Sequence, residues 1–245
     1  MSDEAEFSAA VERNIEALQQ RADLAQMGVD FIRETAELGY SYNFRWMGRP
    51  VIQFPQDLIA LQEIIWAVRP AVIVETGVAR GGSLVFHASM LELLGGDGIV
   101  VGVDVDIRSH NRQAIEEHPM ARRIRLIEGS SVDAEVFSKV RAEVGERSPV
   151  IVILDSNHTH AHVLDELRLY ADLVSPGSFL VVLDTIVEHL PKSMYLDRPW
   201  GPGDNPMTAV RQFLREDPRF EQDRSIDGKL LITVAPEGWL RRKGT

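Results

Sequence analysis

The central part of the chain alternates between two spacings of apolar residues. Short apolar runs, typical of buried strands, are followed by longer segments in which apolar residues recur every three or four positions, as on one face of a helix. Strand and helix units in series predict a parallel, doubly wound sheet with helices on both faces. The predicted strands are residues 71–75, 99–104, 123–128, 150–155 and 178–184, and the helices between them are 83–94, 109–117, 132–144 and 161–174.

The N-terminal part has a different pattern. Residues 3–38 alternate apolar and charged positions at helical spacing, which predicts two helices or one helix broken near Gly28. An aromatic-rich segment with prolines follows over residues 40–55, and the next apolar face predicts a helix over 56–68. We therefore expect an N-terminal helical extension and cap over residues 1–55.

The C-terminal part predicts a lid and an antiparallel end to the sheet. A long loop rich in proline and glycine follows Asp184, and loops of this length in a compact domain are often functional. A helix is expected over 208–216, and residues 220–225 and 229–234 predict a hairpin around an Asp-Gly pair. Residues 56–245 are thus expected to form one α/β domain with a seven-stranded, mostly parallel sheet.

Composition narrows the class of protein. The 245 residues, 44% of them hydrophobic, suffice for one sizeable core, and the net charge of −11 disfavours nucleic acid or an anionic membrane as the main partner. The chain has no cysteine, so disulfides, zinc–thiolate sites and thiol nucleophiles are excluded. No apolar run approaches the ~20 residues of a membrane span, and the acidic start has no signal-peptide pattern. A cytoplasmic protein is the expectation.

The ends of two predicted strands carry ionisable residues. Asp155 follows the apolar run 150–154, and His158 comes three positions later; Asp184 ends the last strand of the parallel series. In open α/β sheets the ligand crevice lies beyond the carboxyl ends of the strands. Two carboxylates and a histidine at this edge predict a divalent metal with a base beside it. His160 and His162 are expected to be ordinary residues of a helix face.

The first strand runs into a glycine-rich turn. The spacing G-x-x-x-G-G is neither the dinucleotide fingerprint nor a phosphate loop, and no phosphate-binding lysine is present. An acid at the end of the second strand is placed to accept hydrogen bonds from ribose hydroxyls, and an acid at the end of the first strand favours a cationic amino-acid moiety. S-adenosylmethionine is therefore favoured over a dinucleotide. The expected cofactor-binding residues are Glu75, Gly77, Arg80, Gly81, Gly82, Ser83 and Asp104.

Two serines after the third strand have two interpretations. Ser130 and Ser131 are placed to border the adenine of the cofactor. They equally suit the N-terminal cap of the helix expected to begin near Val132.

Four motifs together resemble a known family. They are residues 75–83 (ETGVARGGS), 154–158 (LDSNH), 181–185 (VVLDT) and 198–206 (RPWGPGDNP). Over residues 42–240 the chain resembles the cephalosporin hydroxylase/rhamnosyl O-methyltransferase family, a branch of the Rossmann-like class I methyltransferases.

The resemblance implies a cofactor, a metal and a reaction. It implies S-adenosylmethionine, Mg²⁺ and methyl transfer to a hydroxyl of a small molecule, often a sugar of a natural product or lipid, by a homo-oligomer. It also implies that Asp155 and Asp184 hold the metal and that His158 takes the proton. The family often has Glu-Asp where this chain has Leu183 and Asp184, so Thr185, Glu188 or water is the third ligand. We assign Thr185 to the metal set.

Two other functions fit parts of the pattern. A hydroxylase would use iron held by Asp155, His158 and His160, although a 2-His-1-carboxylate site needs histidines that ligate together. A non-catalytic binding subunit would explain the missing acid at Leu183.

Overall fold

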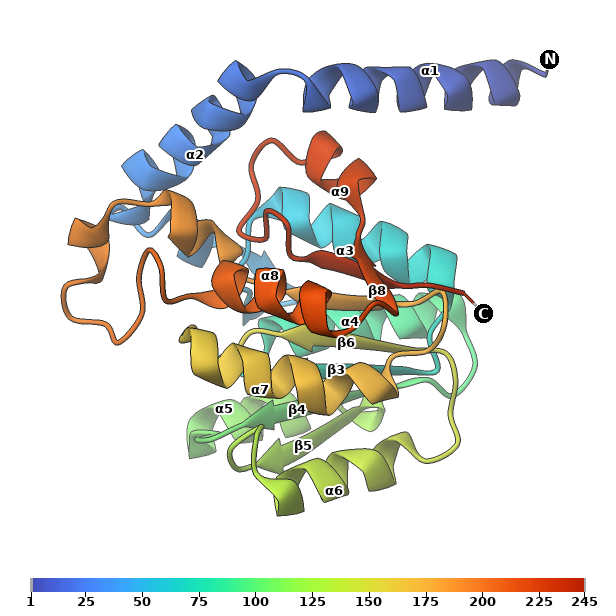
Figure 1. The fold of residues 1–245 in the computed structure, drawn as a ribbon. Helices are drawn as coiled ribbons and strands as arrows, with labels where there is room; N and C mark the ends of the chain where they lie inside the picture. The colour runs from blue at the N-terminus through green and yellow to red at the C-terminus, as the bar shows by residue number, and fades with distance from the viewer. Residues whose placement is uncertain (1, 245) are drawn as a thin grey trace.

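A seven-stranded sheet forms the centre of the computed structural model, which describes residues 2–244 (Figure 1). The strand order is β5-β4-β3-β6-β7-β9-β8, with β3 to β7 parallel and β9 antiparallel to both of its neighbours. The parallel series and the mostly parallel seven-stranded sheet are as predicted. The strands are β3 Val72–Thr76, β4 Ile99–Asp104, β5 Ile124–Glu128, β6 Val150–Leu154, β7 Phe179–Val182, β8 Phe220–Gln222 and β9 Trp239–Arg242.

Helices cover both faces of this sheet because every central strand is apolar on both sides. In β6, Ile151 and Ile153 face one core, while Val150, Val152 and Leu154 face the other. All five are almost fully buried, as continuous apolar runs in parallel sheets usually are. The first core is covered by α3 Pro55–Val68, α4 Gly82–Leu94 and α5 Ser109–Glu116, and the second by α6 Ala134–Val144, α7 His160–Tyr170 and α8 Pro206–Glu216.

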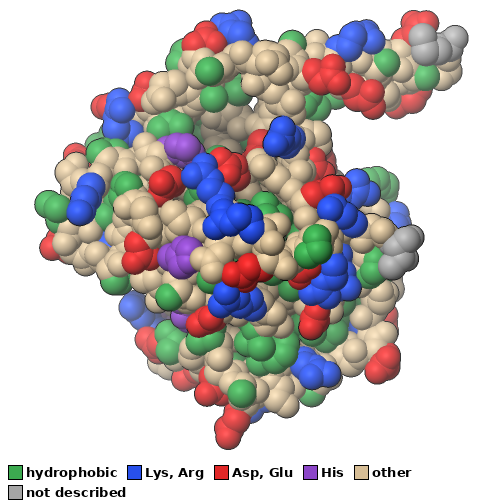
Figure 2. Space-filling model, in the orientation of Figure 1, with side chains coloured by type: hydrophobic (Ala, Val, Ile, Leu, Met, Phe, Trp, Pro, Cys, Tyr) green, Lys and Arg blue, Asp and Glu red, His purple; other side chains and the backbone are tan. Residues whose placement is uncertain are grey.

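The N-terminal extension consists of two helices, α1 Asp3–Gln19 and α2 Ala22–Ala36. The break falls at residues 20–21, so the predicted alternative of a break near Gly28 is wrong. Gly28 lies inside α2, where a Cβ would stand 1.7 Å from the Leu231 carbonyl oxygen. The absence of a side chain at Gly28 allows α2 to pack closely onto the C-terminal segment. Helix α1 has no buried residue and extends from the body of the molecule (Figures 1 and 2).

A short segment joins these helices to the sheet domain. It contains the 3-10 turn η1 Tyr40–Asn43 and the small antiparallel pair β1 Arg45–Trp46 and β2 Arg49–Pro50. The Tyr40 ring packs against Phe44 and Phe54, with ring centroids 5.2 and 5.7 Å away. Phe54 is the N-cap residue of α3, so this packing holds the chain where that helix begins.

The terminal antiparallel pair is present, but its predicted position is partly wrong. Residues 224–229 form the short helix α9 Arg224–Lys229, which Asp223 caps through the Ser225 amide at 3.0 Å. The expected second strand over 229–234 is irregular because Asp57 of α3 binds it, accepting hydrogen bonds from the Thr233 hydroxyl and the Val234 amide. The pairing strand is instead β9.

The loop after β7 lies at the edge where the parallel strands end (Figure 1, orange). It contains the 3-10 turns η4 Thr185–His189 and η5 Lys192–Tyr195. It ends in a capping box at the start of α8, where Asn205 and Thr208 bind each other's backbone. Within residues 2–244, no helix is both long and apolar enough to cross a membrane.

Candidate active site

Two carboxylates and one imidazole meet beyond the ends of β6 and β7. The Nε2 atom of His158 lies 3.1 Å from Asp184 Oδ2 and 3.8 Å from Asp155 Oδ1. One donor atom from each residue falls within 4.8 Å of the other two. The three side chains are only 22%, 23% and 31% exposed, in the order His158, Asp155 and Asp184. We call these residues the acidic cluster. The prediction that the two strand ends converge with His158 beside them agrees with this geometry.

The backbone holds the two acids close together. Strands β6 and β7 are neighbours in register, and the Leu183 amide donates to the Leu154 carbonyl at 3.0 Å, which continues the pairing past the strands. Asp184 then adopts the left-handed conformation, with φ 55°. Aspartate is among the few non-glycine residues that occupy this region, and such strain concentrates at functional sites. The turn places the Asp184 carboxylate toward His158.

The acidic cluster perturbs its own protonation. Burial raises the pKa of Asp155 to about 7, and the negative charge of Asp184 adds to the rise. Burial alone would lower the pKa of His158, but the two carboxylates outweigh it and raise this pKa to about 9. Two close carboxylates with one imidazole favour any added positive charge, whether a proton or a metal ion.

The loop over residues 185–205 closes one side of the acidic cluster. The Trp200 ring lies edge-on to the His158 ring with 5.0 Å between centroids, and the Arg198 guanidinium lies over Trp200. Glu188 accepts hydrogen bonds from the Gly203 amide and from the Asn205 side chain. Glu188 therefore braces this loop, which is a use other than the metal contact considered from the sequence.

Glycines after β3 allow the backbone to pass close to the acidic cluster. Gly77 has φ +93°, and a Cβ on it would stand 2.0 Å from the Asp155 carbonyl oxygen. A Cβ on Gly82 would stand 2.0 Å from the Pro50 carbonyl oxygen. Asp104, at the end of β4, accepts hydrogen bonds from the Val78 amide at 2.8 Å. The glycine loop is thus fixed between the acid at the end of β4 and the acidic cluster.

A cavity of about 400 Å³ lies between the glycine loop and the ends of β4 to β6. A second space of about 40 Å³ adjoins it, since both are lined by Gly77, Ala79 and Asp155. The larger cavity therefore borders the acidic cluster at Asp155. Its lining includes Gly77, Asp104, Ser130, Ser131, Asp155 and His162, and that of the smaller space includes Gln53, Gly77, Arg80, Gly82, Ser83 and Asp155.

Two of the predicted site residues have other partners. The Glu75 carboxylate is 1% exposed, accepts a hydrogen bond from the Ser83 hydroxyl and lies 3.0 Å from His87 Nε2, so it lies behind the glycine loop. The Thr185 hydroxyl is fully buried and donates to the Pro236 carbonyl at 2.6 Å. Neither fact favours the predicted direct contact with cofactor or metal.

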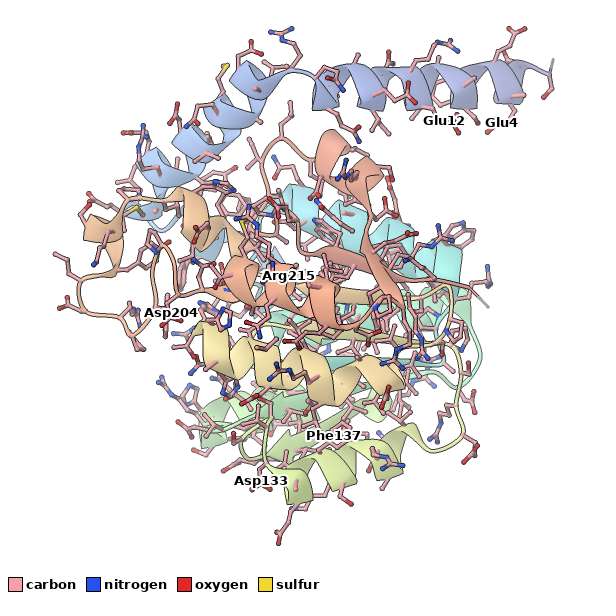
Figure 3. All side chains as sticks on the ribbon, viewed as in Figure 1. Glu4, Glu12, Asp133, Phe137, Asp204 and Arg215 are labelled. Atoms are coloured by element: carbon pink, nitrogen blue, oxygen red, sulfur yellow. The ribbon has the colours of Figure 1, made fainter. Side chains whose placement is uncertain are left out.

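The remaining histidines of the motif separate into two roles. His160 uses both ring nitrogens on α8, at 2.8 Å from Thr208 Oγ1 and 3.1 Å from Gln212 Oε1, and its amide donates to Asp204 (labelled in Figure 3). It is a residue of the helix interface, as predicted. The iron site of the hydroxylase hypothesis therefore lacks its second histidine.

His162 borders the larger cavity, which the sequence did not indicate. Its Nε2 lies 3.0 Å from the Ser131 hydroxyl, and the neighbouring Ser156 donates to the fully buried Glu166 at 2.6 Å. The i, i+4 spacing of His162 and Glu166 on one helix was the available signal. Gln53 was also missed, because nothing in the irregular segment before α3 marks it.

The strand order, the glycine loop and the acid after β4 define the fold of a class I methyltransferase. Solved structures with this fold include a CmcI structure described with Mg and SAM, which matches with a TM-score of 0.58 at 22% identity over 82% of this chain and 77% of the other. An O-methyltransferase from Bacillus cereus in complex with SAH matches with a TM-score of 0.54 at 16% identity, over 95% of this chain and all of the other.

Sequence comparison identifies the family. The profile described as Rhamnosyl O-methyltransferase/CmcI matches residues 38–243, and the chain belongs to this family. Rhamnosyl O-methyltransferase of Mycobacterium tuberculosis (strain H37Rv) is 30% identical over 87% of this chain and 86% of the relative. That of Mycobacterium leprae (strain TN) is 31% identical over 87% of this chain and 92% of the relative. The resemblance inferred from the four motifs is confirmed.

Proposed function

We propose that this protein is an O-methyltransferase that uses S-adenosylmethionine and Mg²⁺ to methylate a hydroxyl of a small molecule, in particular a sugar of a natural product or glycolipid. One observation carries the proposal. Asp155 belongs to the acidic cluster and also lines the cavity formed by the glycine loop, so one residue joins a cation site to a nucleoside-sized space.

The larger cavity suits the nucleoside of the cofactor. Asp104 keeps acceptor capacity beside its backbone contacts, and an acid at this strand end suits ribose hydroxyls. Ser130 and Ser131 border the base end together with His162. Arg80, Gly81, Gly82 and Ser83 belong to the loop that carries the methionine end. Glu75 supports this loop from behind.

The acidic cluster suits a hard divalent cation. Mg²⁺ prefers oxygen ligands, binds through one or two carboxylates and keeps several waters. Asp155 and Asp184 supply the carboxylates, and no side-chain hydroxyl from Thr185 is needed. When bound, the ion would polarise the acceptor hydroxyl and lower its pKa.

His158 is the base of the proposed reaction. Its Nε2 atom lies 3.1 Å from Asp184 and 3.8 Å from Asp155, so the imidazole would be next to an acceptor hydroxyl bound at a cation on these two carboxylates. Trp200 packs against this ring and covers it from solvent. Gly77 lets the loop pass close to Asp155, so that a cofactor held by the loop would have its methyl group and sulfur near an acceptor oxygen at the acidic cluster.

Two further observations support an acceptor and an assembly. The relatives of about 30% identity are named rhamnosyl O-methyltransferases, which supports a deoxysugar hydroxyl as the acceptor. The exposed apolar side chain of Phe7, 67% accessible on a helix without any buried residue, supports a homo-oligomer in which α1 contacts a second copy. The cytoplasmic location stays a prediction.

Transfer of an isotope-labelled methyl group to a panel of rhamnosides tests this function. We expect labelled product with Mg²⁺, loss of product with a chelator, and recovery when Mg²⁺ is restored. Undiminished transfer in the chelator would contradict the metal's role. Absence of S-adenosylhomocysteine binding in calorimetry would contradict the function as a whole.

A further inference from the structure

Gln53 lies between the glycine loop and the acidic cluster. It follows β2, is 4% exposed, and its Nε2 donates to Asp155 Oδ2 at 3.3 Å. The amide nitrogen of Gln53 thus faces the Asp155 carboxylate, which accepts hydrogen bonds through its oxygens. In this orientation the oxygen of the Gln53 amide is not the atom that contacts Asp155.

The Gln53 oxygen has no partner. Among residues 2–244, no donor reaches the buried Oε1 atom. Buried carbonyl oxygens are nearly always hydrogen-bonded, and one without a partner destabilises the fold. An orphaned acceptor at the edge of a site is accordingly a place where a ligand donor is expected.

The space next to Gln53 is small and lined by the glycine loop. Its volume of about 40 Å³ exceeds what one water needs, and Gly77, Gly82, Ser83 and Asp155 form other parts of its wall. It adjoins the larger cavity through Gly77 and Asp155. A cationic nitrogen placed here would find an uncharged acceptor in Gln53 and a favourable field from Asp155.

We propose that Gln53 binds the α-amino group of the cofactor's methionine moiety through Oε1 while it donates to Asp155 through Nε2, and so couples cofactor binding to metal binding. This inference rests on the proposed function and adds to it a recognition residue and a physical link between two ligands. The coupling between the two ligands requires both the Oε1 and the Nε2 atom of the Gln53 amide. Binding of the amine at Oε1 fixes the amide, and the fixed amide orients Asp155 for the cation.

A double-mutant cycle, with one change in the protein and one in the ligand, tests the amine contact. Calorimetry would compare S-adenosylhomocysteine with its deaminated analogue, in which hydrogen replaces the α-amino group, on the wild type and on Gln53→Met. A hydrogen bond to a charged group corresponds to about a ten- to hundredfold change in affinity. In the wild type we expect removal of the amino group to weaken binding by this factor. In Gln53→Met the same removal should weaken binding less than about threefold, because the variant has already lost the contact.

A matched control and a second variant separate the contact from folding. Gln56 also has a buried Oε1 without a partner, but it lies outside both cavities, so Gln56→Met should retain the full dependence on the amino group. Gln53→Glu keeps an acceptor for the amine and loses the donor to Asp155. In the wild type we expect Mg²⁺ to tighten S-adenosylhomocysteine binding. Gln53→Glu should retain the amino-group dependence but lose this effect of Mg²⁺.

The outcomes are distinguishable. If the wild type binds S-adenosylhomocysteine but binds the deaminated analogue equally well, a water satisfies Gln53 and the inference is wrong while the function stands. If removal of the amino group costs as much in Gln53→Met as in the wild type, Gln53 does not contact it. If the wild type binds no S-adenosylhomocysteine at all, the proposed function fails and this inference fails with it.

Discussion

The acidic cluster and the larger cavity, the two ends of the proposed active site, differ in how their polar groups are already paired. At the acidic cluster, which is the proposed metal end, three ionisable side chains lie together, and their charges mainly contact one another. At the larger cavity, which is the proposed nucleoside end, Asp104 already accepts a hydrogen bond from the backbone of the glycine loop, and the hydroxyl of Ser131 lies within hydrogen-bond distance of His162. The metal end is thus electrostatically incomplete as it stands, whereas the nucleoside end is preformed.

This difference separates two functions within one site. A preformed pocket binds its ligand with little rearrangement, so its residues should set affinity. A cluster with two close carboxylates changes its properties when a cation arrives, so its residues should set the rate. Substitutions at the metal end should therefore mainly lower kcat, and substitutions at the nucleoside end should mainly weaken cofactor binding.

The largest effect is expected for Asp155→Asn. Removal of one carboxylate from the cluster weakens the cation and misplaces the acceptor, so methyl transfer should fall on the order of 10³-fold. Single-turnover assays at saturating cofactor measure it. The control Asp165→Asn, an exposed acid on α7, should retain wild-type rates. A variant of Asp155 within tenfold of the wild type would contradict the role of the cluster.

His158→Gln should lower kcat on the order of 10²-fold, the usual contribution of a general base, with little change in cofactor affinity. The pKa of His158 is raised to about 9 by the carboxylates, so a cation on the same carboxylates should lower it. NMR titration with and without Mg²⁺ measures this shift. A His158 pKa that ignores Mg²⁺ would show that the ion binds elsewhere.

Charge at the metal end should also appear in stability. The folded-state pKa values of Asp155, about 7, and His158, about 9, both lie above their ordinary values, so their protonated forms stabilise the fold. The Asp155 contribution is complete below about pH 4 and is lost as the pH rises through 7; that of His158 is complete below about pH 6.5 and is lost through 9. The free energy of unfolding in chelator should therefore fall as the pH rises from 5 to 9.

Urea unfolding at several pH values checks this trend. Asp57, whose pKa burial raises to about 7, contributes with the same sign in every variant. The difference between the wild type and Asp155→Asn therefore isolates the cluster, and the variant should show the flatter dependence. A steeper dependence in the variant, or a rise in wild-type stability toward pH 9, is the opposite of the expected sign.

Asp104→Asn tests the nucleoside end. It removes charge-assisted acceptance from the ribose and from the loop amides, and should weaken S-adenosylhomocysteine binding about tenfold. Because the metal end is untouched, kcat at saturating cofactor should change less than about threefold. Calorimetry and steady-state kinetics measure the two quantities. A large fall in kcat with unchanged affinity would reverse the assignment of the two ends.

The smallest effect on the site is expected on deletion of residues 2–19. Helix α1 buries none of its residues. Its acidic side chains Glu4 and Glu12 lie away from the strand ends (Figure 3). Cofactor affinity should be unchanged, while the molecular mass in solution, measured by light scattering, should decrease. An intact oligomer after deletion would assign the contact to another surface.

The sequence predicted the parts of the fold that short-range pattern controls. Apolar runs located the parallel strands, and the ends of two of them located Asp155 and Asp184. It misplaced the last strand because the pattern over 229–234 is strand-like, and only the buried Asp57, far away in sequence, holds that segment in an irregular form. Long-range side-chain contacts of this kind leave no periodic signal.

The candidate site shows the same division. Residues at strand ends were found, but the partners of their side chains were not: Thr185 donates to a distant carbonyl, and Glu75 pairs with His87 instead of facing the crevice. Gln53 reaches Asp155 across 102 positions of sequence from a segment without regular structure. Which polar group meets which depends on the tertiary fold, and residue type alone does not specify it.

The central claim is that one cation, held by Asp155 and Asp184, lies next to the methyl group that is transferred. Mn²⁺ is a paramagnetic substitute for Mg²⁺, so NMR relaxation of an isotope-labelled methyl group on bound S-adenosylmethionine measures this proximity. We predict strong, saturable broadening of the methyl signal in the wild type and its absence in Asp184→Asn with cofactor still bound. A methyl signal unaffected by Mn²⁺ in the wild type, or equally broadened in the variant, would contradict the account.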